Sequence, residues 1–268
     1  TAAGWKVAYG TAAAPQPLFH AEHTAGVPQP IVGMPDVMRH CLTNRAGYIV
    51  VFGTGSFFAN GDYQDTSTQS IYGIWDWADE LAAGGIVNPE NYPLGAPTRM
   101  TDYASLPVSL GGASPVTFAL LGQSETAVSD EFRVTSQEKL YDKYIDPDGI
   151  PNNADDQRAW FDAELWESDG AAYTGVRYVG WYFDLPDSGE RVVADATIRA
   201  GLAIMVSVDP SPMPCKIGGH SILQLLQACD GSRPDDEVLD TNDDGVIDAD
   251  DIEANRKDLD DIYYKPVI

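Results

Sequence analysis

The chain alternates short apolar runs with stretches rich in glycine, proline and polar residues. Each run is eight to ten residues long and is rich in β-branched and aromatic side chains. The runs are GYIVVFGTG (47–55), QSIYGIWDW (69–77), VRYVGWYFDL (176–185), ERVVADATI (190–198) and GLAIMVSV (201–208). Runs of this kind are typical of β-strands, and the glycines and prolines between them are typical of turns. The pattern predicts a mainly β fold, with strand groups near 47–53, 70–76, 176–184 and 199–208.

Helical periodicity is weaker and is found in three segments, residues 76–85, 153–168 and 248–262. The second has four large apolar side chains on roughly one side, which favours a helix. The segment GHSILQLLQA (219–228) fits a helix or a strand, because its length and period do not separate the two. Residues 85–130 are expected to form long irregular connections.

The charge of the chain restricts its partners. Among 268 residues, 41 are acidic and 16 are basic, so the net charge is −25. Nucleic acids and anionic membranes attract basic surfaces, so the charge argues against nucleic acid as a partner and against electrostatic docking on anionic lipid. Cations, a salty medium or a basic partner would suit this charge. No apolar run approaches 18 residues, so we expect no transmembrane segment, and the opening TAAGWKVAYG has no features of a signal peptide.

Three cysteines, Cys41, Cys215 and Cys229, leave at least one thiol unpaired within the chain. Cys215 and Cys229 flank a segment of thirteen residues. A bridge between them would close a hairpin-like segment, and an exported protein would permit it. We expect these two residues to lie close together, either bridged or within bridging distance. A zinc cluster is disfavoured because no CxxC pair is present.

The acidic segment DTNDDGVIDADD (240–251) is the strongest candidate for chemistry. It follows a twelve-residue calcium-loop pattern, with oxygen ligands at positions 1, 3, 5, 7, 9 and 12 and glycine at position 6. The predicted calcium ligands are Asp240, Asn242, Asp244, the carbonyl group of Val246, Asp248 and Asp251. Gly245 allows the sharp turn, and Ile247 is expected to point into a core and anchor the loop. The alternative is a solvated acidic loop that binds no metal.

The twelfth position of this loop carries Asp251 instead of the more usual glutamate. Extracellular calcium loops of the dockerin type also end in aspartate. Single loops of this kind are structural and weak, with dissociation constants on the order of 10⁻⁵ to 10⁻³ M. They bind calcium where it is abundant, which places the protein outside the cytoplasm.

A second acidic stretch, YIDPDGIPNNAD (144–155), fits the same pattern less well. Its candidate calcium ligands are Asp146, Asp148, Ile150, Asn152 and Asp155. Tyr144 occupies the first ligand position, and Pro151 replaces the apolar residue at position 8. The alternative is an acidic turn made rigid by its prolines.

The remaining polar clusters favour structural roles. Asp62 and Asp65 follow an Asn-Gly pair that predicts a tight turn. His20 and His23 lack the HExxH context of a zinc site. His40 beside Cys41 is a poor nucleophile and base pair, because neighbours in sequence seldom face each other. No phosphate-binding loop, dinucleotide fingerprint or G-x-S-x-G elbow is present, and we predict no catalytic residues.

Several longer motifs resemble those of PilY-type type IV pilus tip proteins. They are QPIVGMPDVMRH (29–40), GYIVVFGTGSFFANGDYQDTSTQSIYGIWD (47–76), GWYFDLPDSGERVVADATIRAGLAIMVSVDPSPMPCKIGGHSILQLL (180–226) and the loop 240–251. The resemblance covers most of residues 15–252. The paired GTG…IWD and GER…C-x-x-GG motifs, in that order, are specific. Residues 1–268 are thus similar to the C-terminal part of a PilY-type β-propeller domain, with an EF-hand-like or dockerin-like calcium loop at 240–251.

The resemblance implies a modified, quinoprotein-like β-propeller, of which this chain would hold a partial set of blades. It also implies a non-enzymatic protein at the pilus tip or outer cell surface that serves pilus biogenesis, adhesion and twitching motility. Its implied partners are the upstream remainder of the same adhesin, minor pilins or the pilus tip, and a surface or host receptor. Calcium is the implied cofactor. The family's upstream calcium loop and its von Willebrand A-like module have no counterpart here.

Two other functions fit parts of the chain. A quinoprotein-like enzyme would use calcium with a quinone cofactor, but its calcium lies in the propeller funnel and not on a terminal loop. A dockerin-like module needs two such loops in about 60 residues, and here the second candidate lies nearly 100 positions upstream. Absorbance of a bound cofactor would distinguish the first alternative from the pilus protein.

Overall fold

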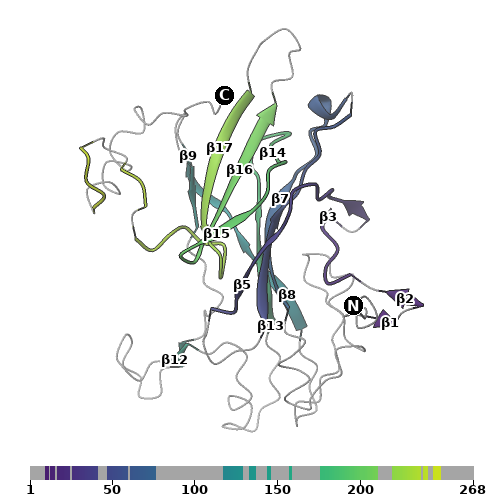
Figure 1. The fold of residues 1–268 in the computed structure, drawn as a ribbon, viewed down its shortest axis with the longest axis horizontal. Coiled ribbons are helices and arrows are strands. Elements are labelled where there is room, and N and C mark those ends of the chain that lie inside the picture. The colour runs from purple at the N-terminus through teal and green to yellow at the C-terminus, as the bar shows by residue number, and fades with distance from the viewer. Residues whose placement is uncertain are drawn as a thin grey trace, which may run out of the picture.

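The fold is mainly β in a computed structural model of the chain (Figure 1). The structure describes residues 10–11, 13–15, 17–24, 26–41, 47–59, 61–76, 117–128, 133–136, 144–145, 157–158, 176–210, 219–236, 238–240 and 244–248. Within these residues the one helical element is a short 3-10 turn, η2 (Asp62–Gln64). No described helix is long and apolar enough to cross a membrane.

The larger sheet has five strands in the order β5-β6-β7-β13-β8. Their bounds are β5 Asp36–Arg39, β6 Tyr48–Gly53, β7 Ser70–Asp76, β13 Val176–Asp184 and β8 Thr117–Gln123. Neighbouring strands are antiparallel except β13 and β8, which run parallel. Parallel neighbours need a long connection between them, and here it includes β9 and β10.

The second sheet has four strands. They are β14 (Arg191–Val192), β15 (Thr197–Arg199), β16 (Leu202–Pro210) and β17 (Gly219–Gln227). Both β14 and β15 pair with the same side of β16, and β17 pairs with its other side over nine residues. All of these pairs are antiparallel. Figure 1 shows β16 and β17 of this sheet in green, beside the purple and blue strands β5 and β7 of the larger sheet.

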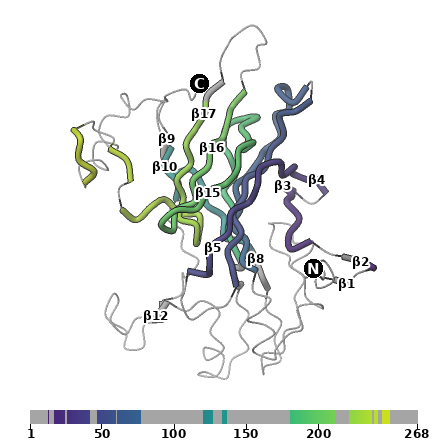
Figure 2. Tube along the Cα trace, in the orientation of Figure 1, coloured from purple at the N-terminus to yellow at the C-terminus, as the bar shows by residue number. Residues whose placement is uncertain are grey.

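Four pairs of short strands complete the described structure, three of them with strands of two or three residues. The strands are β1 (Gly10–Thr11) with β2 (Ala14–Pro15), β3 (Glu22–Thr24) with β4 (Val27–Pro28), β9 (Glu125–Val128) with β10 (Arg133–Thr135), and β11 (Tyr144–Ile145) with β12 (Gln157–Arg158). Figure 1 shows that β1 and β2 lie apart from the two large sheets, and the trace in Figure 2 shows β3 and β4 nearer to them.

The core lies on both faces of the larger sheet. Every residue of β7 from Ser70 to Trp75 is buried. One face packs against the second sheet, and Phe19 from the N-terminal segment covers the other, with its ring 5.0 Å from Tyr72 and 6.2 Å from Phe52. Strands buried on both faces read as continuous apolar runs, which is why YIVVFG and SIYGIWD lack a period of two.

Trp181 of β13 joins the two sheets. Its side chain is fully buried, and its indole N–H donates a 3.0 Å hydrogen bond to the carbonyl of Ala228, just after β17. Gly73 and Gly231 border the ring, and a Cβ atom at either glycine would collide with it. The glycine of the SIYGIWD run is therefore a packing requirement.

Backbone groups also connect the sheets near β5. Asp36 accepts hydrogen bonds from the N–H groups of Ile198, at 2.7 Å, and Val37, at 2.8 Å. These bonds, with that of Ile198 the larger cause, lower the pKa of Asp36. Asp195 accepts a 2.7 Å bond from the Met34 N–H in the same region.

The four predicted strand groups are confirmed as β6, β7, β13 and β16, and the ambiguous segment 219–228 forms β17. The expectation of irregular structure over residues 85–130 is wrong near the C-terminal end of this range, because β8 and β9 occupy 117–123 and 125–128. The helix expected over 153–168 is wrong at Gln157–Arg158, which form β12. The other residues of the three predicted helices lie outside the described structure, apart from Asp76, which ends β7, and Asp248.

The bridge considered between Cys215 and Cys229 is wrong, whereas their expected proximity stays a prediction. Cys229 forms a disulfide with Cys41, across 188 residues, and their Cα atoms are 6.0 Å apart. Cys215 lies outside the described residues. Spacing in the sequence favoured the local partner, whereas packing brings the end of β5 beside the turn after β17. Cys41 is consequently not a free thiol, and the absence of a nucleophile at His40–Cys41 follows from this.

The first prediction concerns this bridge. Cys41→Ser should lower the free energy of unfolding by about 2–5 kcal/mol, because the bridge closes a long loop in the unfolded chain. Urea denaturation of the oxidised protein measures the change, and Cys215→Ser is the matched control that keeps the bridge. Peptide mapping without reduction should recover Cys41 linked to Cys229. Recovery of Cys215 linked to Cys229 would contradict the observed pairing.

Candidate functional site

The predicted calcium loop is described at Asp240 and at residues 244–248. Gly245 has a φ of 86°, which favours glycine, and its N–H donates a 2.8 Å hydrogen bond to Oδ2 of Asp240. The N–H of Val246 donates a 2.8 Å bond to Oδ1 of Asp244. The chain therefore turns back so that the first and fifth positions of the pattern lie near the glycine.

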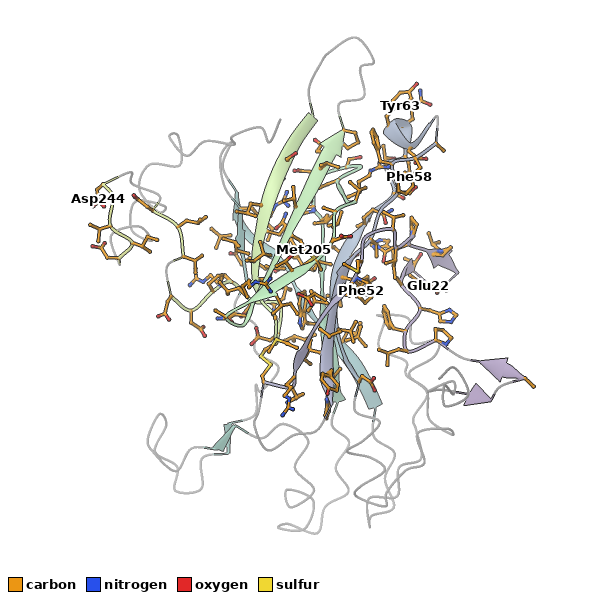
Figure 3. All side chains as sticks on the ribbon, viewed as in Figure 1. Glu22, Phe52, Phe58, Tyr63, Met205 and Asp244 are labelled. Carbon is orange, nitrogen blue, oxygen red and sulfur yellow. A yellow bond between two sulfur atoms is a disulfide. The ribbon has the colours of Figure 1, made fainter. Side chains whose placement is uncertain are left out.

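Ile247 does not anchor this loop. Val246 and Ile247 are each 54% exposed, and the expectation that Ile247 points into a core is wrong. Figures 1 and 3 show the reason, since the described part of the loop, with Asp244 labelled in Figure 3, lies to one side of both sheets. Asp240, Asp244 and Asp248 are exposed as well.

The oxygen donors of the loop suit a hard cation such as Ca²⁺. Asn242 and Asp251 lie outside the described residues, and the described part of the chain contains no group of three or more His, Cys, Asp or Glu side chains placed to hold a metal. Calcium binding at 240–251 therefore stays a prediction. The weaker candidate ligands Asp146, Asp148, Ile150, Asn152 and Asp155 all lie outside the described residues.

The GTG and GER motifs contact each other directly. A Cβ atom at Gly53 would collide with the side chain of Val192, and one at Gly55 would meet Cβ of Arg191. The N–H of Val192 also donates a 2.9 Å hydrogen bond to the carbonyl of Thr54. The glycines let β6 approach β14 closely, so two motifs that are far apart in the sequence form one packing contact between the sheets.

Arg191 holds the loop between β6 and β7. Its guanidinium is buried and donates to the carbonyls of Ser56 at 2.8 Å, Asp65 at 2.6 Å and Gly189 at 2.8 Å. Three charge-assisted bonds to backbone oxygens fix both ends of the loop. The arginine of GER is thus fully occupied by the fold and faces no open site.

Asp62 supports the same loop from within. Its Oδ2 accepts bonds from the N–H groups of Ala59, at 3.0 Å, and Phe58, at 2.7 Å, and from the Ser56 hydroxyl, at 3.2 Å. The bond from Ala59, followed by that from Phe58, lowers the pKa of Asp62. The predicted tight turn at this position is confirmed, and Figure 3 shows Phe58 and Tyr63 at its tip.

An ionic network forms around the buried side chain of Arg133 in β10. Its guanidinium contacts three carboxylates, those of Glu125 at 2.8 Å, Asp187 at 2.9 Å and Glu190 at 2.9 Å. The Arg133 side chain is 3% exposed and that of Glu190 is 0% exposed. Burial opposes the charge of Arg133, but the hydrogen bond and charge of Glu190 and the other two carboxylates outweigh it and raise the pKa of Arg133.

The same oxygen of Glu190 accepts bonds from side chains of the second sheet. Ser207 donates a short hydrogen bond to it, and the Gln224 amide lies 3.3 Å away. Gln224 also donates to the Ser207 hydroxyl at 3.0 Å. Glu190 therefore ties the β9–β10 hairpin to the interior face of β16 and β17, and the charge is compensated within the fold.

A second polar cluster lies at the ends of β7 and β13. The Ser70 hydroxyl donates to Asp184 at 2.6 Å, and the Tyr72 hydroxyl donates to Gln29 at 2.5 Å. Burial is the main cause that raises the pKa of Tyr72. Asp184 lies 3.9 Å from a ring nitrogen of His23, and the Ser70 hydroxyl donates directly to the carboxylate. This order does not activate a serine nucleophile.

Reasoning from the sequence missed Arg133, Ser207 and Gln224. Ser207 and Gln224 occupy core-facing positions in strands whose other core-facing residues are apolar. This contrast was the signal in the sequence that could have identified them. Polar side chains at such positions need partners inside the fold. Arg133 stands in a short strand within a stretch that had no clear period, and nothing local pairs it with Glu190.

The second prediction tests this network. Arg133→Met should destabilise the protein by about 3–5 kcal/mol, because it leaves Glu190 buried without its cation. Arg39→Met is the control, since Arg39 is an exposed strand residue, and should change little. Adding Glu190→Gln to Arg133→Met should restore part of the loss. Urea denaturation at pH 7 measures all three variants, and equal stability of the two single variants would refute the role of the network.

Known proteins resemble this chain in sequence. The family model for the PilY1 beta-propeller domain matches residues 2–91. The type IV pilus biogenesis factor PilY1 of Pseudomonas aeruginosa is 26% identical over 254 residues, which are 92% of this chain and 18% of that protein. A PilY1 homolog of Xylella fastidiosa is 34% identical over 103 residues, which are 36% of this chain and 7% of that protein. The chain thus spans less than a fifth of the length of these curated relatives.

A solved structure supports the same relationship at the level of the fold. The crystal structure of the Pseudomonas aeruginosa PilY1 C-terminal domain matches with a TM-score of 0.53 and 24% sequence identity, over 87% of this chain and 38% of that chain. The similarity covers the mainly β architecture described above, and the matched residues 2–91 include β5, β6 and β7. The family model, the curated relatives and the solved fold agree that the chain is similar to PilY1-type proteins.

Proposed function

We propose that the chain is a non-enzymatic part of a type IV pilus assembly that serves pilus biogenesis, surface adhesion and twitching motility. The observation that carries the proposal is the similarity over 92% of this chain to a protein named as a type IV pilus biogenesis factor. The proposed location is extracellular, at the pilus tip or outer cell surface. The proposed partners are the upstream remainder of the same adhesin, minor pilins or the pilus tip, and a surface or host receptor.

The described use of the motif residues supports a structural role. The residues of both motifs make contacts between strands and loops. They are Gly53 and Gly55 of GTG and Glu190 and Arg191 of GER. Catalytic groups need access to a substrate, and the side chains of Glu190 and Arg191 are buried inside the fold. A quinoprotein-like propeller that supplies a rigid framework, and not a redox centre, fits this arrangement.

Calcium is part of the proposal. An ion at Asp240, Asn242, Asp244, Val246, Asp248 and Asp251 would relieve the repulsion among carboxylates in a chain of net charge −25. A second ion at Asp146, Asp148, Ile150, Asn152 and Asp155 would bind more weakly. The turn at Gly245, whose N–H donates to Asp240, is the described feature that suits such a loop.

The third prediction concerns calcium and stability. Chelation should lower the melting temperature by several degrees, because an ion at about 100 times its dissociation constant stabilises the folded state by about 2.7 kcal/mol. Asp240→Ala should abolish this response and remove one bound ion in a titration. Asp243→Ala removes the same charge at a non-ligand position of the pattern and should keep both. An unchanged melting temperature on chelation, with no bound ion, would contradict the proposed site.

The fourth prediction concerns the pilus. Deleting the encoding gene should reduce surface pili and attachment, and the wild-type gene should restore them. A gene with Asp240→Ala and Asp244→Ala together should restore them less well at limiting calcium than at high calcium, because the remaining ligands bind the ion more weakly. Electron microscopy and an attachment assay measure both effects. Normal piliation in the deletion strain, or a bound quinone cofactor with dehydrogenase activity, would favour the enzyme instead.

A further inference from the structure

Strand β17 forms an open edge of the second sheet. Among the described strands it pairs with β16 alone, and Figure 1 shows it at the border of that sheet. The edge is nine residues long, which exceeds the usual length of a strand. Long open edges are the surfaces on which another strand adds to a sheet.

The register shows which backbone groups point outward. The N–H of Ala228 donates to Gly201 on the β16 side. In an antiparallel pair the direction alternates, so Leu226, Gln224 and Ile222 also face β16. Ser221, Leu223 and Leu225 face away from it.

These outward groups find no backbone partner within the described part of the chain. At the end of the strand, the Gln227 N–H already donates to the carbonyl of Ser232 at 2.7 Å. The open edge is therefore the segment from Ser221 to Leu225, with three N–H and three C=O groups. An edge strand from another chain would satisfy all six of them.

The side chains along this edge offer an apolar surface. Leu223 is 50% exposed, and Leu225 is partly buried on the same outer face. Their cross-strand neighbours on β16 are Val206 and Ile204, which are also only partly buried. A sheet face that meets only water normally carries polar side chains, so apolar side chains of a strand added beside β17 would extend this apolar face.

The usual devices that block an edge are missing here. Residues 221–227 contain no proline, no charged side chain and no bulge. The edge of β5 shows the contrast, because the carbonyl of Met34 just before it accepts the N–H of Ala196 and the carboxylate of Asp36 accepts that of Ile198. The chain itself thus contacts the β5 edge, whereas the β17 edge has no further strand among the described residues.

From these observations we propose that β17 binds an extended apolar segment of another polypeptide by β-strand addition at Ser221–Leu225. Main-chain hydrogen bonds supply the affinity, and aliphatic side chains at alternate positions of the segment rest on Leu223 and Leu225. The net charge of −25 favours a segment flanked by basic residues and disfavours a second copy of this chain. The proposal depends on the described edge and not on the proposed role in the pilus.

A synthetic peptide tests the edge directly. The probe is the β16 segment LAIMVSV with two lysines at each end, because that sequence already pairs with β17 from the other side. Fluorescence anisotropy should show saturable binding to the purified chain. Hydrogen exchange should show new protection of the Leu223 and Leu225 amides, whereas the Ile222 and Gln224 amides, which face β16, should be protected with and without peptide. The same peptide N-methylated at alternate residues should bind at least about tenfold more weakly.

Variants of Leu223 separate backbone pairing from apolar contact. Leu223→Pro removes an N–H that β16 does not use, and proline is tolerated at such edge positions. It should weaken peptide binding about tenfold at an unchanged melting temperature. Leu223→Thr keeps the N–H and favours strand geometry, so it should weaken binding less.

Three outcomes would overturn the proposal. The first is that the peptide neither binds nor protects the two amides, and the second is that its N-methylated form binds equally well. The third is that the chain dimerises by itself, as measured by sedimentation, and that Leu223→Pro makes it monomeric, because the edge then serves a second copy. If Leu223→Pro fails to fold, comparing the unmodified peptide with its N-methylated form still decides whether backbone pairing at this edge binds the peptide.

Discussion

The close approach of the two sheets at Trp181 is the contact on which the other features depend. The ring fills the space between Gly73 and Gly231, and its N–H reaches the carbonyl of Ala228. Burying an aromatic side chain of this size contributes about 4–6 kcal/mol by area. The geometry allows no side chain at either glycine, so the glycines and the tryptophan form one unit. A few residues away, Cys41 and Cys229 close the same interface covalently.

Once the sheets are at this distance, the polar residues between them need partners. Glu190 finds Arg133, Ser207 and Gln224, and Arg191 finds three carbonyl groups. Each bond satisfies a group that burial would otherwise destabilise. The family motifs are therefore places where strands approach closely or where a buried charge is compensated. This is the physical reason that they read as structural and not as catalytic.

The polar and apolar features that the interface does not use lie at the periphery. The acidic loop around Asp244 lies beside the sheets with its side chains in solvent, and the edge of β17 exposes Leu223. The acidic loop is a candidate binding site for a cation, and the edge of β17 is a candidate binding site for a strand of another chain. Each proposal can be tested alone, because the first rests on the residues of the acidic loop and the second on the backbone groups of the strand edge.

The sequence by itself determined the strands of the core, because runs such as YIVVFG and SIYGIWD are apolar throughout and end at turn residues. It also determined the calcium-loop pattern at 240–251 and the family resemblance, since both depend on spacing along the chain. Only the tertiary structure decided the partner of Cys229, the pairing of β8 with β13, and the meeting of Arg133 with Glu190. These contacts join residues tens to hundreds of positions apart, and local periodicity contains no information about them. Ile247 shows the same limit, because an apolar residue in a pattern becomes buried only where another element covers it.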